Sequence, residues 1–107
     1  MKLSKKIANF TQTHTIRATA QSIKIIDLVP SKFVNCSELF LSHNSIKTLG
    51  KIDQFHLVSR LMLEFNDICY IEDLVPLGRL PNLTELRLDG NPVCNLIFWD
   101  LHTIDMC

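Results

Sequence analysis

The chain has 107 residues, the usual size of a single domain, and 47% of them are apolar. Eleven Lys and Arg residues balance eleven Asp and Glu residues, which speaks against a broad basic face for nucleic-acid phosphates or a long acidic tail. No apolar run approaches the roughly 18–20 residues that span a bilayer, so we expect neither a nucleic-acid partner nor a membrane segment.

Residues 1–12 are expected to form an N-terminal tail or cap. They include Lys2, Lys5 and Lys6 but lack the continuous apolar stretch of a secretory signal peptide. We therefore expect a cytoplasmic protein, with the cytoskeleton, a cilium or the nucleus as further locations. Intracellular reductants would keep the cysteines as thiols. The four are Cys36, Cys69, Cys94 and Cys107.

Residues 13–35 carry a degenerate copy of a motif that recurs three times further along the chain. Its members lie one residue out of the strict period and are Ile16, Ala18, Gln21, Ile23 and Ile26. Gln21 stands where the later copies have asparagine, which leaves the form of this turn open. Terminal copies of a repeat are commonly atypical because they cap the stack.

Residues 36–57, 58–82 and 83–107 each contain one full copy, of the form L-x-x-L-x-L-x-x-N-x-(I/V). Cys36 and Val58 replace the first leucine in two of them. The motif asparagines are Asn44, Asn66 and Asn91, spaced by 22 and then 25 residues. We place the three additional residues within 77–82, on the outer side of the fold.

The Leu-x-Leu core alternates with period two, which predicts a short strand with one buried face. Successive strands should lie side by side in a parallel sheet on the concave side of the molecule. Each asparagine follows a strand, where its side-chain amide can bond the backbone groups of the turn. A helical bundle with coincidental leucine spacing is the less favoured alternative.

At 39–46, 61–68 and 86–93 the sequence resembles leucine-rich repeat proteins of the 22-residue class. The resemblance covers about residues 13–104. Members of the class include axonemal and centrosomal proteins, a spliceosomal subunit and a regulatory subunit of protein phosphatase 1. The resemblance implies an α/β solenoid of three clear repeats plus one degenerate N-terminal repeat. The C-terminal helical cap usual in the class is incomplete here, and Leu96, Trp99 and Ile104 are the residues expected to cover that end.

The residues that alternate with the buried leucines should form the concave surface that solenoids generally use. The candidate partner-binding residues are Arg17, Phe40, Met62, Glu64, Arg87 and Asp89. Phe40 and Met62 would form an exposed apolar centre between two arginines, beside an acidic strip. Such residues are typical of protein interfaces, although they could simply shield the sheet. Glu38, Arg60 and Glu85 are expected to form a cross-strand charge ladder.

The sequence has no Gly-rich phosphate loop and no H-E-x-x-H or C-x-x-C spacing, so we expect no cofactor, metal or small-molecule substrate. Cys94 and His102 could be imagined as a nucleophile and base, but nothing orients the histidine. We therefore expect a non-catalytic intracellular module that binds a protein partner. The alternatives are a structural subunit of a cytoskeletal or axonemal assembly and, from the resemblance alone, a regulatory subunit of a protein phosphatase.

Overall fold

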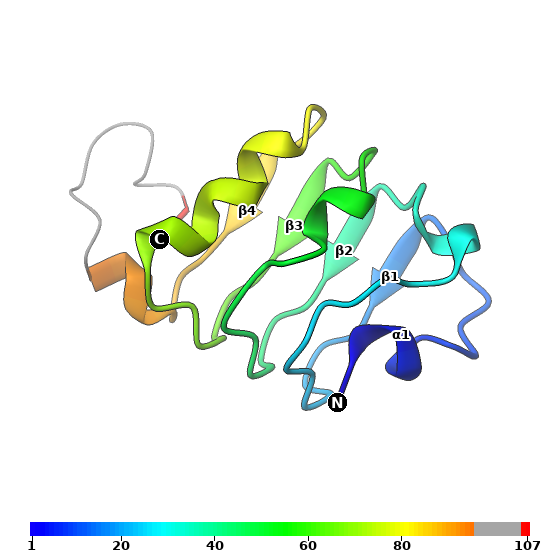
Figure 1. The fold of residues 1–107 in the computed structure, drawn as a ribbon, viewed down its shortest axis with the longest axis horizontal. Coiled ribbons are helices and arrows are strands. Elements are labelled where there is room, and N and C mark those ends of the chain that lie inside the picture. Colours follow the sequence, from blue (N-terminus) through cyan, green and yellow to red (C-terminus); the bar gives the residue numbers. More distant parts are fainter. Residues whose placement is uncertain (96–105) are drawn as a thin grey trace.

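Each Leu-x-Leu block forms a three-residue strand in the computed structural model, which describes residues 1–95 and 106–107. The strands are β1 (Thr15–Arg17), β2 (Glu38–Phe40), β3 (Arg60–Met62) and β4 (Glu85–Arg87). They pair in parallel, in the order β1-β2-β3-β4 (Figure 1). Leu39, Leu61 and Leu86 are directly aligned. The predicted parallel sheet is confirmed, and the helical-bundle alternative is wrong.

Short helices lie on the segments that connect one strand to the next. The α-helix α1 (Leu3–Lys6) precedes the sheet, and in the part of the chain that the structure describes four 3-10 helices follow its strands. These are η1 (Ser31–Phe33), η2 (Ile52–Gln54), η3 (Ile71–Arg79) and η4 (Pro92–Asn95). Helix η3 has nine residues where η1 and η2 have three, so it accommodates the longer spacing between Asn66 and Asn91.

The core lies between the sheet and these connecting segments. Ile16, Leu39 and Leu61 are completely buried on the inner face of the sheet. The apolar residues that follow each turn are buried as well, and they are Ile23, Ile46, Ile68 and Val93. Each strand contributes too few apolar side chains to form a core alone, so burial depends on the alignment of neighbouring strands.

One position of the repeat departs from the core. Ile71, Leu74 and Leu77 stand in the places of the buried residues Leu49, Ile52 and Phe55, so the repeat predicts that they pack against the core. Leu74 and Leu77 are partly buried against it, but Ile71 is 53% exposed, and the prediction is wrong there. The longer helix η3 has no fully buried side chain, and it contacts the core through the partly buried Leu74 and Leu77.

The N-terminal segment covers the first connecting arm. Leu3 and Ile7 are completely buried, and the Leu3 N–H donates to the Ile25 carbonyl at 2.9 Å. The Ser4 amide donates to Asp27 Oδ1 at 2.9 Å, and the Ser4 hydroxyl donates to the second carboxylate oxygen. Burial alone would raise the pKa of Asp27, but the hydrogen bonds from Ser4 outweigh it and lower that pKa.

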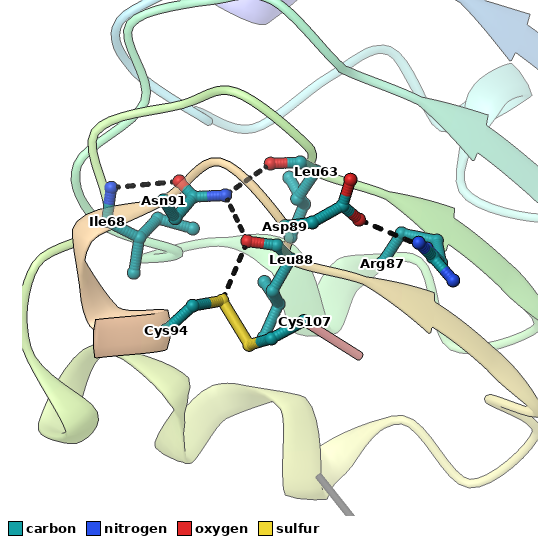
Figure 2. Close-up of a disulfide and its surroundings, with 8 residues drawn as sticks. All are labelled: Leu63, Ile68, Arg87, Leu88, Asp89, Asn91, Cys94 and Cys107. Carbon is teal, nitrogen blue, oxygen red and sulfur yellow. Dashed lines mark hydrogen bonds and ion pairs between the residues drawn. A yellow bond between two sulfur atoms is a disulfide. The ribbon is translucent and has the colours of Figure 1, made fainter. Parts of the chain in front are cut away.

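The three motif asparagines are buried and join consecutive blocks. Asn66 Nδ2 donates to the carbonyl of Leu63 in its own block and to the carbonyl of Leu41 in the block before, both at 3.0 Å. Its Oδ1 accepts from the Ile46 N–H at 3.1 Å. Asn91 bonds in the same way to Leu88, Leu63 and Ile68 (Figure 2).

The first turn, which has Gln21 in place of asparagine, is held by the asparagine of the following block. Asn44 Oδ1 accepts from the N–H groups of Gln21 at 2.9 Å and Ile23 at 3.0 Å. Asn44 Nδ2 donates to the Ala18 carbonyl at 2.9 Å. The substitution at position 21 is therefore tolerated because the turn receives its hydrogen bonds from outside its own block.

The residue before each motif asparagine has a left-handed backbone. His43 has φ 58°, Phe65 has φ 56° and Gly90 has φ 79°. A bulky residue such as Phe is uncommon in this region. The His43 and Phe65 rings stack with centroids 4.7 Å apart. A Cβ atom at Gly90 would lie 2.4 Å from Phe65 Cδ1, so the glycine permits the Phe65 ring to lie over it.

We predict that Gly90→Ala lowers the free energy of unfolding by about 1–2 kcal/mol, because alanine would strain the left-handed backbone and displace the Phe65 ring. Gly78→Ala is the matched control, since a Cβ there meets nothing within 4 Å. Chemical denaturation of both variants measures the difference. Equal stability of the two variants would refute this role for Gly90.

Candidate functional site

The candidate site is the sheet face opposite the core, which we call the Phe40 face. It carries the side chains that alternate with the buried strand residues. These are Thr15, Arg17, Glu38, Phe40, Arg60, Met62, Glu85 and Arg87. Four of the predicted binding residues, Arg17, Phe40, Met62 and Arg87, form one row, each on its own strand and in register with the next.

The aromatic ring of Phe40 lies beneath two cations. The Arg17 guanidinium carbon is 4.6 Å from the ring centroid and that of Arg60 is 5.5 Å away. Phe40 is only half-buried, so its ring retains exposed surface. Guanidinium groups stack favourably on aromatic rings. The apolar centre of the face is therefore covered in part by charged groups that a partner could contact together with the ring.

Met62 does not form an exposed apolar centre, and that part of the prediction is wrong. Its side chain is only 7% exposed. Met62 stands between Phe40 and Arg87 on adjacent strands. Adjacent strands are about 4.8 Å apart, so the large side chains of the two flanking strands can cover the side chain of the residue on the middle strand. Met62 supports Phe40 rather than presenting its own surface.

The second row of the Phe40 face is a continuous charge ladder, as predicted. Arg60 Nη1 lies 2.7 Å from Glu38 Oε2, and Arg60 Nε lies 2.6 Å from Glu85 Oε2. The Thr15 hydroxyl donates to Glu38 Oε1 at 3.1 Å. The hydrogen bond from Arg60 is the main cause of a lowered pKa at Glu38, and the two glutamates raise the pKa of Arg60.

The third predicted element, an acidic strip of Glu64 and Asp89, lies just beyond the strand ends. Asp89 Oδ1 accepts from Arg87 Nε at 3.1 Å, so this carboxylate is paired (Figure 2). One carboxylate oxygen of Glu64, Oε1, is shielded from solvent and has no hydrogen-bond partner among the described residues. The two carboxylates therefore differ, and within the described part of the chain only Asp89 is paired with a neighbouring cation.

The expectation of four thiols is wrong for two of the cysteines. Cys94 and Cys107 form a disulfide, and Cys94 Sγ lies 3.0 Å from the Leu88 carbonyl (Figure 2). Sequence spacing did not reveal the bond, because the pairing depends on where the C-terminal residues return to β4. Cys36 and Cys69 are free. Burial raises the pKa of the Cys36 thiol to about 12.

Other expectations fall partly or wholly outside the described residues. His102, considered as a base for Cys94, and the capping residues Leu96, Trp99 and Ile104 all lie within 96–105. In the described ranges, no three His, Cys, Asp or Glu side chains are grouped to hold a metal ion. Across residues 1–95 and 106–107, no helix is long and apolar enough to cross a membrane.

Comparison with known proteins gives no assignment of this site, since no known protein family matches the chain and no curated protein matches it as a relative.

We predict that Glu38 titrates below the usual Glu pKa of roughly 4.3, and that Arg60→Gln raises its pKa. The lowered pKa stabilises the fold above the unfolded-state pKa, and this contribution is lost as the pH falls through the folded-state pKa. Carboxyl NMR titration measures both proteins. Arg79→Gln is the control, because Arg79 pairs with Asp53 rather than with Glu38. If Glu38 titrates identically with and without Arg60, the ladder does not set its pKa.

We also predict that an alkylating reagent labels only Cys69 in the native, unreduced protein. The disulfide protects two cysteines, and a buried thiol with a pKa near 12 has almost no thiolate at neutral pH. Reduction should add Cys94 and Cys107, and unfolding should add Cys36. Mass spectrometry of the labelled peptides identifies each site. Labelling of Cys94 and Cys107 without reductant would contradict the disulfide.

Proposed function

We propose that the chain is a leucine-rich repeat solenoid that binds a protein partner without catalysing a reaction, and that the Phe40 face is its concave binding surface. The observation that carries this proposal is the row Arg17–Phe40–Met62–Arg87, which runs across all four strands in register. Aromatic residues and arginine are enriched at the centres of protein interfaces.

The geometry of the row supports a binding role in two ways. First, Arg17 and Phe40 both offer accessible surface, and together they can contact an apolar group and a carboxylate of one partner. Second, the charge ladder fixes the Arg60 side chain beside the ring through two glutamates. Pre-ordered side chains lose less conformational entropy when a partner binds.

The fold part of the proposal rests on the aligned blocks. Parallel strands in sequential order, a buried asparagine after three of them, and a shared core are the features that a leucine-rich repeat solenoid requires. We extend the proposal to a cytoplasmic location, which the intracellular members of the class that the sequence resembles support. In that compartment, glutathione and thioredoxin would reduce the disulfide.

A structural subunit of a cytoskeletal or axonemal assembly is the second candidate. It would require the far end of the sheet to receive another subunit. Met106 accepts a hydrogen bond from the Leu88 N–H, so the chain itself occupies part of that end. Regulation of a phosphatase rests on the resemblance alone and ranks third.

The direct test is Phe40→Ala, compared with the unmodified chain by affinity capture and quantitative mass spectrometry. We expect partners of the Phe40 face to be recovered at least tenfold less, the loss typical of a central interface residue. Tyr70→Ala is the matched control, because Tyr70 is a 65% exposed aromatic residue at the start of η3. Thermal unfolding verifies that both variants are folded. An unchanged set of partners for Phe40→Ala would remove the Phe40 face from the proposal.

A further inference from the structure

Strand β1 is an edge strand whose outer backbone groups have no partner among the described residues. The Ala18 N–H donates to the Phe40 carbonyl and the Glu38 N–H donates to the His14 carbonyl, so the even-numbered residues of this segment face β2. In a parallel pair of strands, the backbone N–H and C=O groups of the intervening residues point away from the partner strand. The N–H and C=O groups of Thr15 and Arg17 therefore face outward, and β2 is the one strand that pairs with β1 within residues 1–95 and 106–107.

At the opposite edge of the sheet, the backbone next to β4 has a partner from the chain itself. The Leu88 N–H, directly after β4, donates to the Met106 carbonyl at 2.5 Å. The adjacent Cys107 is tied to Cys94 by the disulfide (Figure 2). The C-terminal residues thus pair with the chain at the β4 edge, whereas residues 1–7 pair with the arm around Ile25 and leave the β1 edge uncovered.

A hollow of about 410 Å³ lies along the uncovered edge. It is lined by Asn9, Phe10, Thr11, Gln12, Thr15 and Arg17. The segment 9–12 forms one wall and β1 forms the other. A hollow of this size lies at the low end of the range for ligand sites, roughly 300–1,000 Å³. It fits a short stretch of extended chain, with the half-buried Phe10 as an apolar contact and amide side chains beside it.

The positive charge at this edge belongs to Arg17, which has no hydrogen-bonded acidic partner among the residues that the structure describes. Arg60 is bonded to two glutamates, and Arg87 is bonded to Asp89. Arg17 stacks on Phe40 and adds to the field that lowers the pKa of Glu38, but it donates a hydrogen bond to no residue within the described parts of the chain. A guanidinium held in this way presents a planar fork that matches a carboxylate.

We propose that the outer edge of β1 accepts an extended segment of a partner protein as a fifth strand, and that an Asp or Glu side chain of this segment binds Arg17. The backbone of the added strand pairs with Thr15 and Arg17, which gives affinity, and the carboxylate gives specificity. The inference rests on the proposed protein-binding function and shares Arg17 with the Phe40 face, but the backbone pairing takes place at the sheet edge rather than on that face.

A second copy of the chain is a poorer occupant of this edge. Two β1 edges placed together would present Thr15 and Arg17 to the same residues of the other copy. Neither copy would supply a carboxylate from the paired strand, so both Arg17 guanidinium groups would remain without an acidic partner. Like charges brought close together also oppose association.

The test uses the full chain and a capped peptide, Lys-Thr-Val-Glu-Val-Thr-Lys, which alternates as a strand and places glutamate at its centre. Amide exchange is followed by ¹H–¹⁵N NMR at millimolar peptide. In the free protein the amides of Thr15 and Arg17 should exchange fast and that of Ile16 slowly. Peptide should slow the exchange of Thr15 and Arg17 at least tenfold. No change at these two amides would overturn the proposal.

Two sets of matched controls separate the backbone from the charge. One peptide is N-methylated at both valines, and another is N-methylated at the threonines and the glutamate. The N–H groups of alternate residues point to opposite sides of a strand, so only one of the two sets can pair with β1. Strand addition therefore predicts that one methylated peptide binds and the other does not. Replacing glutamate by glutamine should weaken binding about tenfold, and Arg17→Gln should remove that difference. Arg79→Gln is the protein control, since Arg79 lies on η3. Equal binding of both methylated peptides, or of the Glu and Gln peptides, would refute the inference.

Two further outcomes distinguish this inference from self-association of the chain and from binding at the Phe40 face. Protection of Thr15 and Arg17 that grows with protein concentration, without peptide, would identify a second copy as the occupant and overturn the acidic-peptide proposal. Phe40→Ala in partner capture tests the Phe40 face, whereas the methylated peptides test the edge. Failure of one experiment is therefore distinguishable from failure of the other.

Discussion

The structure depends on one interaction, the buried side-chain amide that bridges two consecutive blocks of the chain. Asn44, Asn66 and Asn91 each satisfy backbone groups that the turns leave without strand partners. An unpaired backbone group in a buried turn costs about 1–3 kcal/mol. Because each asparagine serves its own block and the preceding one, the turns and the strand register hold one another in place.

The same alignment that buries the core creates both candidate surfaces. With Leu39 and Leu61 facing inward, the alternating residues must face outward in register, which places Arg17 beside Phe40 and Arg60 between two glutamates. A shift of one residue in the register would exchange these two sets of side chains. The pattern on the Phe40 face and the unpaired β1 edge are thus consequences of how the apolar residues are spaced.

The spacing of apolar residues and asparagine was enough to predict the strands, their parallel order and the charge ladder, because each depends on local period and register. It could not predict the burial of Met62, which depends on the reach of side chains from two neighbouring strands. It also missed the Cys94–Cys107 disulfide, which depends on Cys107 lying beside Cys94 in space, and the exposure of Ile71 on the longer helix η3. In the candidate site, the members of the row and the accessible surface of Arg17 and Phe40 were predictable, whereas the burial of Met62 was not.

The most direct test of the bridging role is Asn66→Ala, studied by chemical denaturation and by hydrogen exchange of the Ile46 amide. Asn66 belongs to the third block, and its side chain bonds two residues of the second block. It accepts a hydrogen bond from the Ile46 N–H and donates one to the Leu41 carbonyl. The account predicts a loss of about 3 kcal/mol in the free energy of unfolding and faster exchange at Ile46. Asn82→Ala, at an exposed asparagine, should change neither. Equal stability of the two variants, with unchanged exchange at Ile46, would contradict the account.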